Sequence, residues 1–222
     1  MAFQLLEPDV ALTDYGLTLL SLVLAWLIYR TKNTDNRLKI MVTFFYLSLA
    51  LGSAIGGTVH GFFPLKMSLG HAILWQSTLI VIGITALLLW LIVGELLFPK
   101  YRVFITYVVS AEFALYAMYI LFLNQEFRIA LYNYIPPTIL LLVSFIYCQI
   151  KSGKKFFLLG ISGILLTFIA AFIQQSKIAS HPIYFNHNAL YHSIQIVALI
   201  LIFANFKLLL KKRRLLRKYV AS

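Results

Sequence analysis

Residues 71–98, HAILWQSTLIVIGITALLLWLIVGELLF, decide the class of the fold because this long apolar run contains a single charged side chain, Glu95. A helix needs about 20 mostly apolar residues to cross the hydrocarbon core of a bilayer. The run is therefore long enough to cross with one helix, and we predict that it is a transmembrane helix.

Six further apolar segments precede and follow this run. The predicted spans are residues 15–29, 40–63, 71–98, 103–123, 129–150, 156–173 and 188–210. Hydrophobic residues make up 61% of the 222 residues and charged residues 12%, whereas about a quarter of an ordinary soluble domain is charged. We therefore predict one all-α domain over residues 1–222, a polytopic seven-transmembrane-helix bundle in which short loops connect the helices.

Positive charge is concentrated in alternate connections between the predicted spans. Residues 30–39, 100–102, 151–155 and 207–218 hold 16 of the 19 Lys and Arg residues. Seven spans place all four groups on one side, and loops rich in Lys and Arg are typically cytoplasmic. The pattern predicts an integral multi-pass membrane protein with its N-terminus outside and its C-terminus in the cytoplasm. The net charge of +12 thus reflects orientation, with membrane lipids and no nucleic acid as partners.

All five histidines fall at the opposite, outer end of this predicted bundle, at positions His60, His71, His181, His187 and His192. Ionisable residues in or beside membrane spans are costly and mark functional sites by default. A neutral imidazole is also the commonest metal ligand in proteins. The sequence therefore predicts a polar site, and a candidate metal site, at the outer end.

The spacing of small and polar residues indicates which histidines face the interior. Ser48, Gly52, Gly56 and His60 recur every four residues, which places them on one helix face that allows close packing. Asn188 and His192 are likewise four apart and share a face of the last helix. We expect His60 and His192 to point inward and to approach each other.

The predicted chain resembles the CREST superfamily in four features. These are seven helices, a histidine near the end of the second, a polar start to the third and a histidine motif at the start of the seventh. This superfamily joins alkaline ceramidases with the progestin and adiponectin receptor family. Its active members are zinc-dependent amidases that act on ceramide-like lipids. They hold zinc with one histidine of the second helix and two of an HxxxH motif on the seventh. The resemblance implies that His60 and His192 are zinc ligands.

The chain departs from the pattern of that superfamily at several positions. Asn188 replaces the first histidine of HxxxH, and His71 stands where the family has an Asp. The third metal ligand is therefore either His71 or His187, the residue directly before Asn188. Gly56 stands where the family has a serine, for which Ser53 and Thr58 are imperfect substitutes. We expect Asn188, Ser53 and Thr58 to be the polar groups beside the metal.

These residues lead to a predicted function with two alternatives. The first hypothesis is a zinc-dependent intramembrane hydrolase that acts on a lipid amide or ester at the outer face of the bundle. The second is a non-catalytic seven-helix protein, receptor-like or structural, that retains a polar histidine cavity. The third is a b-type cytochrome with His60 and His192 as axial haem ligands. The zinc content and the absorption spectrum of the purified protein distinguish the three.

Overall fold

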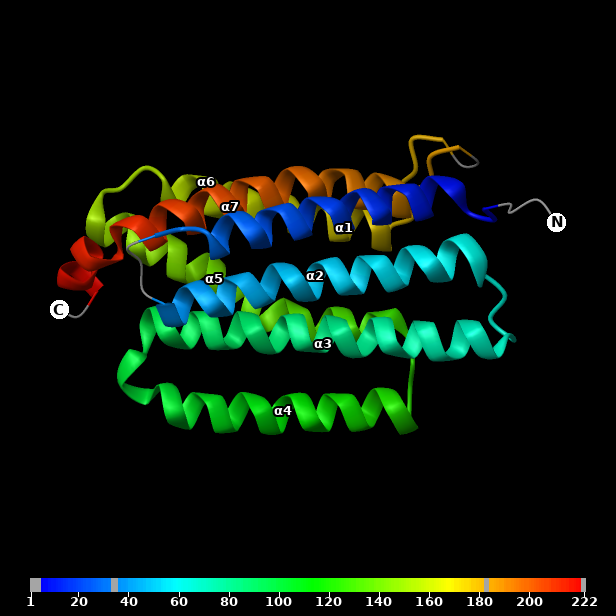
Figure 1. Cartoon of the computed structure of the whole chain (residues 1–222), viewed down its shortest axis with the longest axis horizontal. Coiled ribbons are helices and arrows are strands. Elements are labelled where there is room, and N and C mark those ends of the chain that lie inside the picture. Colours follow the sequence, from blue (N-terminus) through cyan, green and yellow to red (C-terminus); the bar gives the residue numbers. More distant parts are fainter. Residues whose placement is uncertain (1–4, 33–35, 182–183, 221–222) are drawn as a thin grey trace.

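The structure is a computed structural model that describes residues 5–32, 36–181 and 184–220 (Figure 1). The ends of the predicted domain, residues 1–4 and 221–222, lie outside this part. Within it the chain forms seven α-helices and one 3-10 turn: α1 (Pro8–Tyr29), α2 (Asn36–Phe62), α3 (Leu69–Leu97), η1 (Pro99–Tyr101), α4 (Arg102–Phe122), α5 (Phe127–Ser152), α6 (Phe157–Gln175) and α7 (His187–Val220). Seven of the described helices are long and apolar enough to cross a membrane. This confirms the predicted all-α class and the seven helices of spanning length.

The first helix begins at Pro8, well before the predicted start at Tyr15. Proline is favoured in the first turn because its missing N–H would have no helical partner there. Asp9 in the same turn interacts favourably with the positive end of the helix dipole. This earlier start corrects the prediction and places Asp14 inside α1, where only 4% of the residue is exposed.

Six of the helices surround a common interior, whereas α4 lies at the edge of the molecule against α3 (Figure 1). Four of the largest fully buried side chains, Phe45, Phe145, Phe157 and Phe206, belong to one core cluster, to which α1, α2, α3, α5, α6 and α7 contribute. All four lie in the half of the bundle where α2 begins and α5 ends. Close packing of these rings fills that half.

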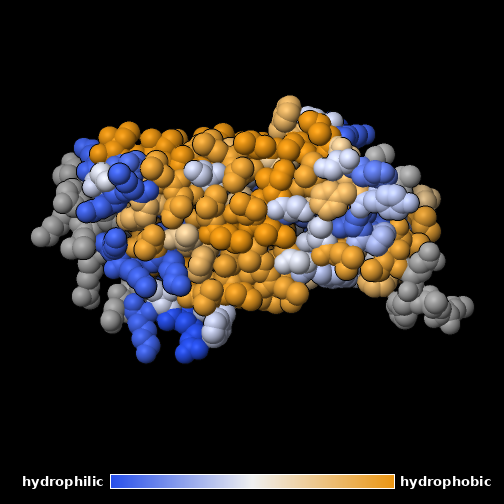
Figure 2. All heavy atoms as spheres, turned by 90° about the horizontal axis from the view of Figure 1, so that it is seen from above, coloured by the Kyte–Doolittle hydropathy of each residue, from blue (hydrophilic) through white to orange (hydrophobic). Residues whose placement is uncertain are grey.

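Apolar side chains cover the middle of the molecule, and hydrophilic side chains gather toward its two ends (Figure 2). We call the end at which α1 begins the histidine end, because it carries all five histidines. The opposite end, which carries the clusters of Lys and Arg in the described residues, is the basic end. An apolar band between two polar ends is the surface expected of a helical bundle in a bilayer.

Candidate functional site

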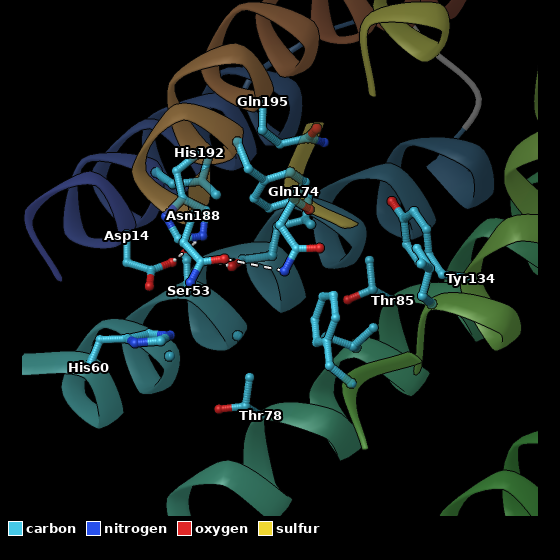
Figure 3. Close-up of a pocket in the computed structure, with 18 of the residues that line it drawn as sticks. Asp14, Ser53, His60, Thr78, Thr85, Tyr134, Gln174, Asn188, His192 and Gln195 are labelled. Carbon is cyan, nitrogen blue, oxygen red and sulfur yellow. Dashed lines mark hydrogen bonds and ion pairs between the residues drawn. The ribbon is translucent and has the colours of Figure 1, made fainter. Parts of the chain in front are cut away.

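A cavity of about 240 Å³ lies inside the bundle, toward the histidine end. Side chains from α1, α2, α3, α5, α6 and α7 line it (Figure 3). Most of its wall is apolar, and its polar lining consists of Asp14, Ser48, Ser53, His60, Thr78, Thr85, Tyr134, Gln174, Asn188, Tyr191, His192 and Gln195. A pocket with apolar walls and a few convergent polar groups is the usual form of a small-molecule site.

The small-residue face of α2 forms one wall of this cavity. Ser48, Gly52, Gly56 and His60 all line it, which confirms that this face turns inward. The glycines let neighbouring side chains come into contact with the helix: a Cβ atom added at Gly56 would lie 3.5 Å from Asp14 Oδ2. With a rise of 1.5 Å per residue, the wall from His60 to Ser48 is about 18 Å long. The cavity therefore extends from the histidine end toward the middle of the bundle.

Asp14 of α1 and His192 of α7 meet at the cavity. The distance from His192 Nε2 to Asp14 Oδ1 is 3.3 Å, and only 4% of Asp14 and 9% of His192 is exposed. Gly57 allows α1 to come this close to α2, since a Cβ atom there would lie 2.9 Å from Asp14 Cβ. A buried carboxyl group is costly unless it is paired or neutralised. The position of Asp14 beside an imidazole therefore has an electrostatic reason.

Both imidazoles that line the cavity are oriented through their Nδ1 atoms. His60 Nδ1 lies 2.5 Å from Glu7 Oε2, and His192 Nδ1 lies 3.1 Å from Thr13 Oγ1. The Thr13 hydroxyl donates to the carbonyl oxygen of Asp9 at 2.9 Å, which leaves its oxygen to accept from His192 Nδ1–H. The carboxylate of Glu7 accepts in the same way from His60. With Nδ1 as the donor, the Nε2 atom of each ring carries the lone pair, and the Nε2 atom of His192 faces Asp14 Oδ1.

The 3.3 Å distance between Asp14 Oδ1 and His192 Nε2 is that of an ion pair, and it equally matches two neighbouring ligands of one metal ion. Two ligands at 2.0–2.1 Å from a tetrahedral zinc are about 3.3 Å apart, whereas a direct charge-assisted hydrogen bond is about 2.7–2.9 Å long. His60 lines the same cavity, and its ring is drawn close to Asp14 in Figure 3. Among the described residues, no three His, Cys, Asp or Glu side chains are gathered closely enough to hold a metal ion. Asp14 and His192 are therefore two neighbouring side chains of ligand type, and the described residues place no third one within reach of both.

Two polar residues predicted from the sequence complete the described wall. Asn188 Oδ1 accepts a hydrogen bond from Gln174 Nε2 at 3.2 Å, so that the Asn188 Nδ2 group is left to donate elsewhere. The Ser53 hydroxyl donates to the carbonyl oxygen of Leu49 at 2.8 Å and also pairs with Thr18 Oγ1 at 3.0 Å. Neither partner of Ser53 is a base, so these contacts do not activate it as a nucleophile.

Three other predicted site residues are not part of the described cavity wall. The Thr58 hydroxyl lies 3.1 Å from Tyr15 Oη, at the contact between α2 and α1. His71 Nδ1 lies 2.7 Å from the carbonyl oxygen of Phe63, in the connection between α2 and α3. His187 is the first residue of α7. The structure therefore brings together His60, His192, Asn188 and Ser53 from the predicted set.

Sequence reasoning missed Asp14 together with the two residues that orient the imidazoles, Glu7 and Thr13. All three precede residue 15, where the first predicted span begins. The signal that could have found them is Pro8, because proline is favoured in the first helical turn. A helix that begins there carries Asp14 nearly two turns inside the bundle.

Comparison with known proteins gives one match. A model of a family of unknown function (DUF6962) matches residues 10–211. No curated protein and no solved structure matches the chain. The matched range contains Asp14, His60, Asn188 and His192, so the cavity lies within the part that the family model covers.

Proposed function

This chain belongs to DUF6962, a family of unknown function, and we propose that it is a membrane-embedded hydrolase that cleaves an amide or ester bond of a lipid. The observation that carries this proposal is the buried pair of Asp14 and His192 beside an elongated, mostly apolar cavity. A carboxyl group and two oriented imidazoles supply acid–base chemistry. Apolar walls of this length match a substrate whose reactive carbonyl is attached to a hydrocarbon chain.

The site faces the outer leaflet in this proposal. Seven helices of spanning length and the apolar band of Figure 2 support a multi-pass integral membrane protein. The concentration of Lys and Arg at the basic end supports an N-terminus outside and a C-terminus in the cytoplasm. The histidine end, and with it the cavity, then lies on the outer side.

Reporter fusions test this orientation. After Ser222, a reporter that works only in the cytoplasm is expected to be active. In the connection between α6 and α7, a reporter that works only outside is expected to be active. The matched insertion in the connection between α5 and α6, which carries Lys151, Lys154 and Lys155, should behave like the C-terminal fusion. The reverse pattern would place the cavity on the cytoplasmic side and remove the outer leaflet as the source of substrate.

Zinc is the proposed cofactor, and Asp14, His60 and His192 would hold it. Asp14 takes the place of the third ligand, for which the sequence offered His71 or His187, and two histidines with one carboxylate are a ligand set of zinc hydrolases. The orientation of both imidazoles through Nδ1 and the 3.3 Å spacing between Asp14 and His192 support this assignment. When bound, zinc would polarise the substrate carbonyl and lower the pKa of a water molecule.

The side chains around the cavity have separate tasks in this reaction. Asp14 Oδ2, the carboxylate oxygen that is not the one paired with His192, accepts a proton from the attacking water. The water oxygen bonds to the acyl carbon while Asn188 Nδ2 donates to the carbonyl oxygen, where negative charge develops. The C–N or C–O bond then breaks, and Asp14 returns the proton to the leaving amine or alcohol. The products are a fatty acid and an amine or alcohol.

Zinc content and product release from the purified chain test the proposal together. We expect about one zinc per chain and release of fatty acid from lipid amides or esters in mixed micelles. His60→Ala and His192→Ala should each lower zinc content at least tenfold, because each removes a ligand. The matched control is His71→Ala, a histidine at the same end of the bundle whose ring contacts Phe63 instead of the cavity.

Each outcome of this experiment has a clear meaning. Full zinc retention in both cavity variants would contradict the ligand assignment. Fatty-acid release without zinc would contradict the proposed cofactor but support the proposed hydrolase activity. A chain with neither zinc nor activity would support the second hypothesis, a non-catalytic seven-helix protein with a polar histidine cavity.

A further inference from the structure

A second hollow lies on the outside of the bundle, between α4 and the first part of α5. This α4–α5 groove has a volume of about 660 Å³ and is separate from the central cavity. Tyr116 of α4 forms part of its wall and donates a hydrogen bond to the carbonyl oxygen of Leu79 in α3 at 2.8 Å. This contact holds α4 against α3, where Figure 1 shows it at the edge of the molecule. The groove is therefore open toward whatever surrounds the bundle.

Two polar side chains line this otherwise largely apolar groove. Glu112 Oε2 and Asn133 Nδ2 are both buried, and neither has a hydrogen-bond partner. Glu112 is the central residue of α4, about 15 Å from either end of the helix. Unsatisfied polar groups are expensive at this depth of a membrane, and hydrocarbon chains of lipids offer neither donor nor acceptor. A polar group of another protein chain inside the membrane would satisfy both side chains.

We propose that a second copy of this chain docks on the α4–α5 groove and that Asn133 Nδ2 of each copy donates to Glu112 of the other. A two-fold axis along the membrane normal keeps every residue at its own depth and makes the contact reciprocal. One unsatisfied acceptor and one unsatisfied donor on each copy are complementary under this symmetry. The terminal torsions of Glu and Asn are broad, so both groups can turn into the groove without movement of the helices.

The shape of α4 on the groove side supports a helical partner. Ala111 lines the groove and is exposed, and small residues at such positions let helix backbones approach closely in membranes. Leu115 lines it as well, with 65% of the residue exposed. Of the residues in α4, only Val109, Tyr116 and Ile120 are buried within one copy.

Single-molecule counting in lipid vesicles at graded protein-to-lipid ratios tests the dimer. The unmodified chain should dimerise, and Glu112→Ala or Asn133→Ala should weaken dimerisation by about ten- to a hundredfold, since each removes both reciprocal contacts at about three- to tenfold per contact. A mixture of the two variants keeps one contact, between Glu112 of one copy and Asn133 of the other. Mixed pairs should therefore be weakened only about three- to tenfold. A role of these residues inside one copy would not produce this preference for mixed pairs.

A matched pair of bulky substitutions tests the position of the partner. Ala111→Trp fills the groove and should prevent dimerisation, whereas Ser110→Trp, at a neighbouring exposed position outside the groove, should leave it unchanged within twofold. A chain that stays monomeric at all ratios would overturn the proposal. A dimer insensitive to Glu112→Ala, Asn133→Ala and Ala111→Trp would overturn it as well, as would mixed pairs no stronger than the like pairs or a different protein seated on the groove.

Discussion

Replacement of Asp14 with asparagine is expected to lower kcat for lipid hydrolysis by about a thousandfold. Asparagine has nearly the same shape, but it cannot take a proton from water, and general acid–base catalysis contributes roughly 10²–10⁴ in rate. It also removes the carboxylate that stands 3.3 Å from His192 Nε2, so that zinc content should fall with activity. The measurement is kcat for the purified variant with a lipid amide or ester, together with its metal content.

Asp9→Asn is the matched control for this substitution. Asp9 is a carboxylate of the same helix, and its Oδ2 accepts a hydrogen bond from the backbone N–H of Asn186 at 2.9 Å outside the described cavity wall. Asparagine retains an acceptor for that bond, so we expect kcat within about twofold of the unmodified chain, as for most substitutions away from a site. Equal losses in both variants would assign the effect to the fold of α1, and an unchanged kcat in Asp14→Asn would exclude Asp14 as the base.

The number and type of the helices could be predicted because spanning a bilayer demands long apolar segments, which are visible in a single sequence. The start of α1 could not be found in this way. Hydropathy treats Asp9 and Asp14 as the end of an apolar segment, whereas the backbone follows the local preference of Pro8 for a first helical turn. Membrane spans predicted from hydropathy are therefore too short where a buried carboxyl group lies near a helix end.

The candidate site was predictable only where its residues share one helix. The four-residue spacing placed His60 on the inward face of α2, and Asn188 with His192 on one face of α7. Contacts between helices do not follow from spacing. Asp14 meets His192 because α1 packs against α7, and Glu95 pairs with Arg37 of α2 at 3.3 Å, although Lys100 is much nearer to it in sequence.

The packing that brings Asp14 to the cavity leads to the second large effect. Gly57→Ala is expected to lower the free energy of unfolding by about 1–3 kcal/mol, because inserting a methyl group into a close contact strains the packing. The added Cβ atom would lie 2.9 Å from Asp14 Cβ and 3.3 Å from the carbonyl oxygen of Ala11. Backbone atoms of α1 therefore have to move, and Asp14 moves with them. The unfolding free energy in detergent micelles and kcat measure the two consequences.

Gly52→Ala, on the same helix, separates this strain from the general effect of replacing a glycine. Alanine is favoured over glycine in a helix interior by about 1 kcal/mol in both variants. At Gly52, however, the nearest atom to the added Cβ is Val81 Cγ1 at 3.4 Å, an ordinary contact, and the methyl group enters the cavity wall. We expect no loss of stability there and a smaller change in kcat than for Gly57→Ala. Equal stability of the two variants would show that α1 shifts without cost, and then the position of Asp14 would not depend on Gly57.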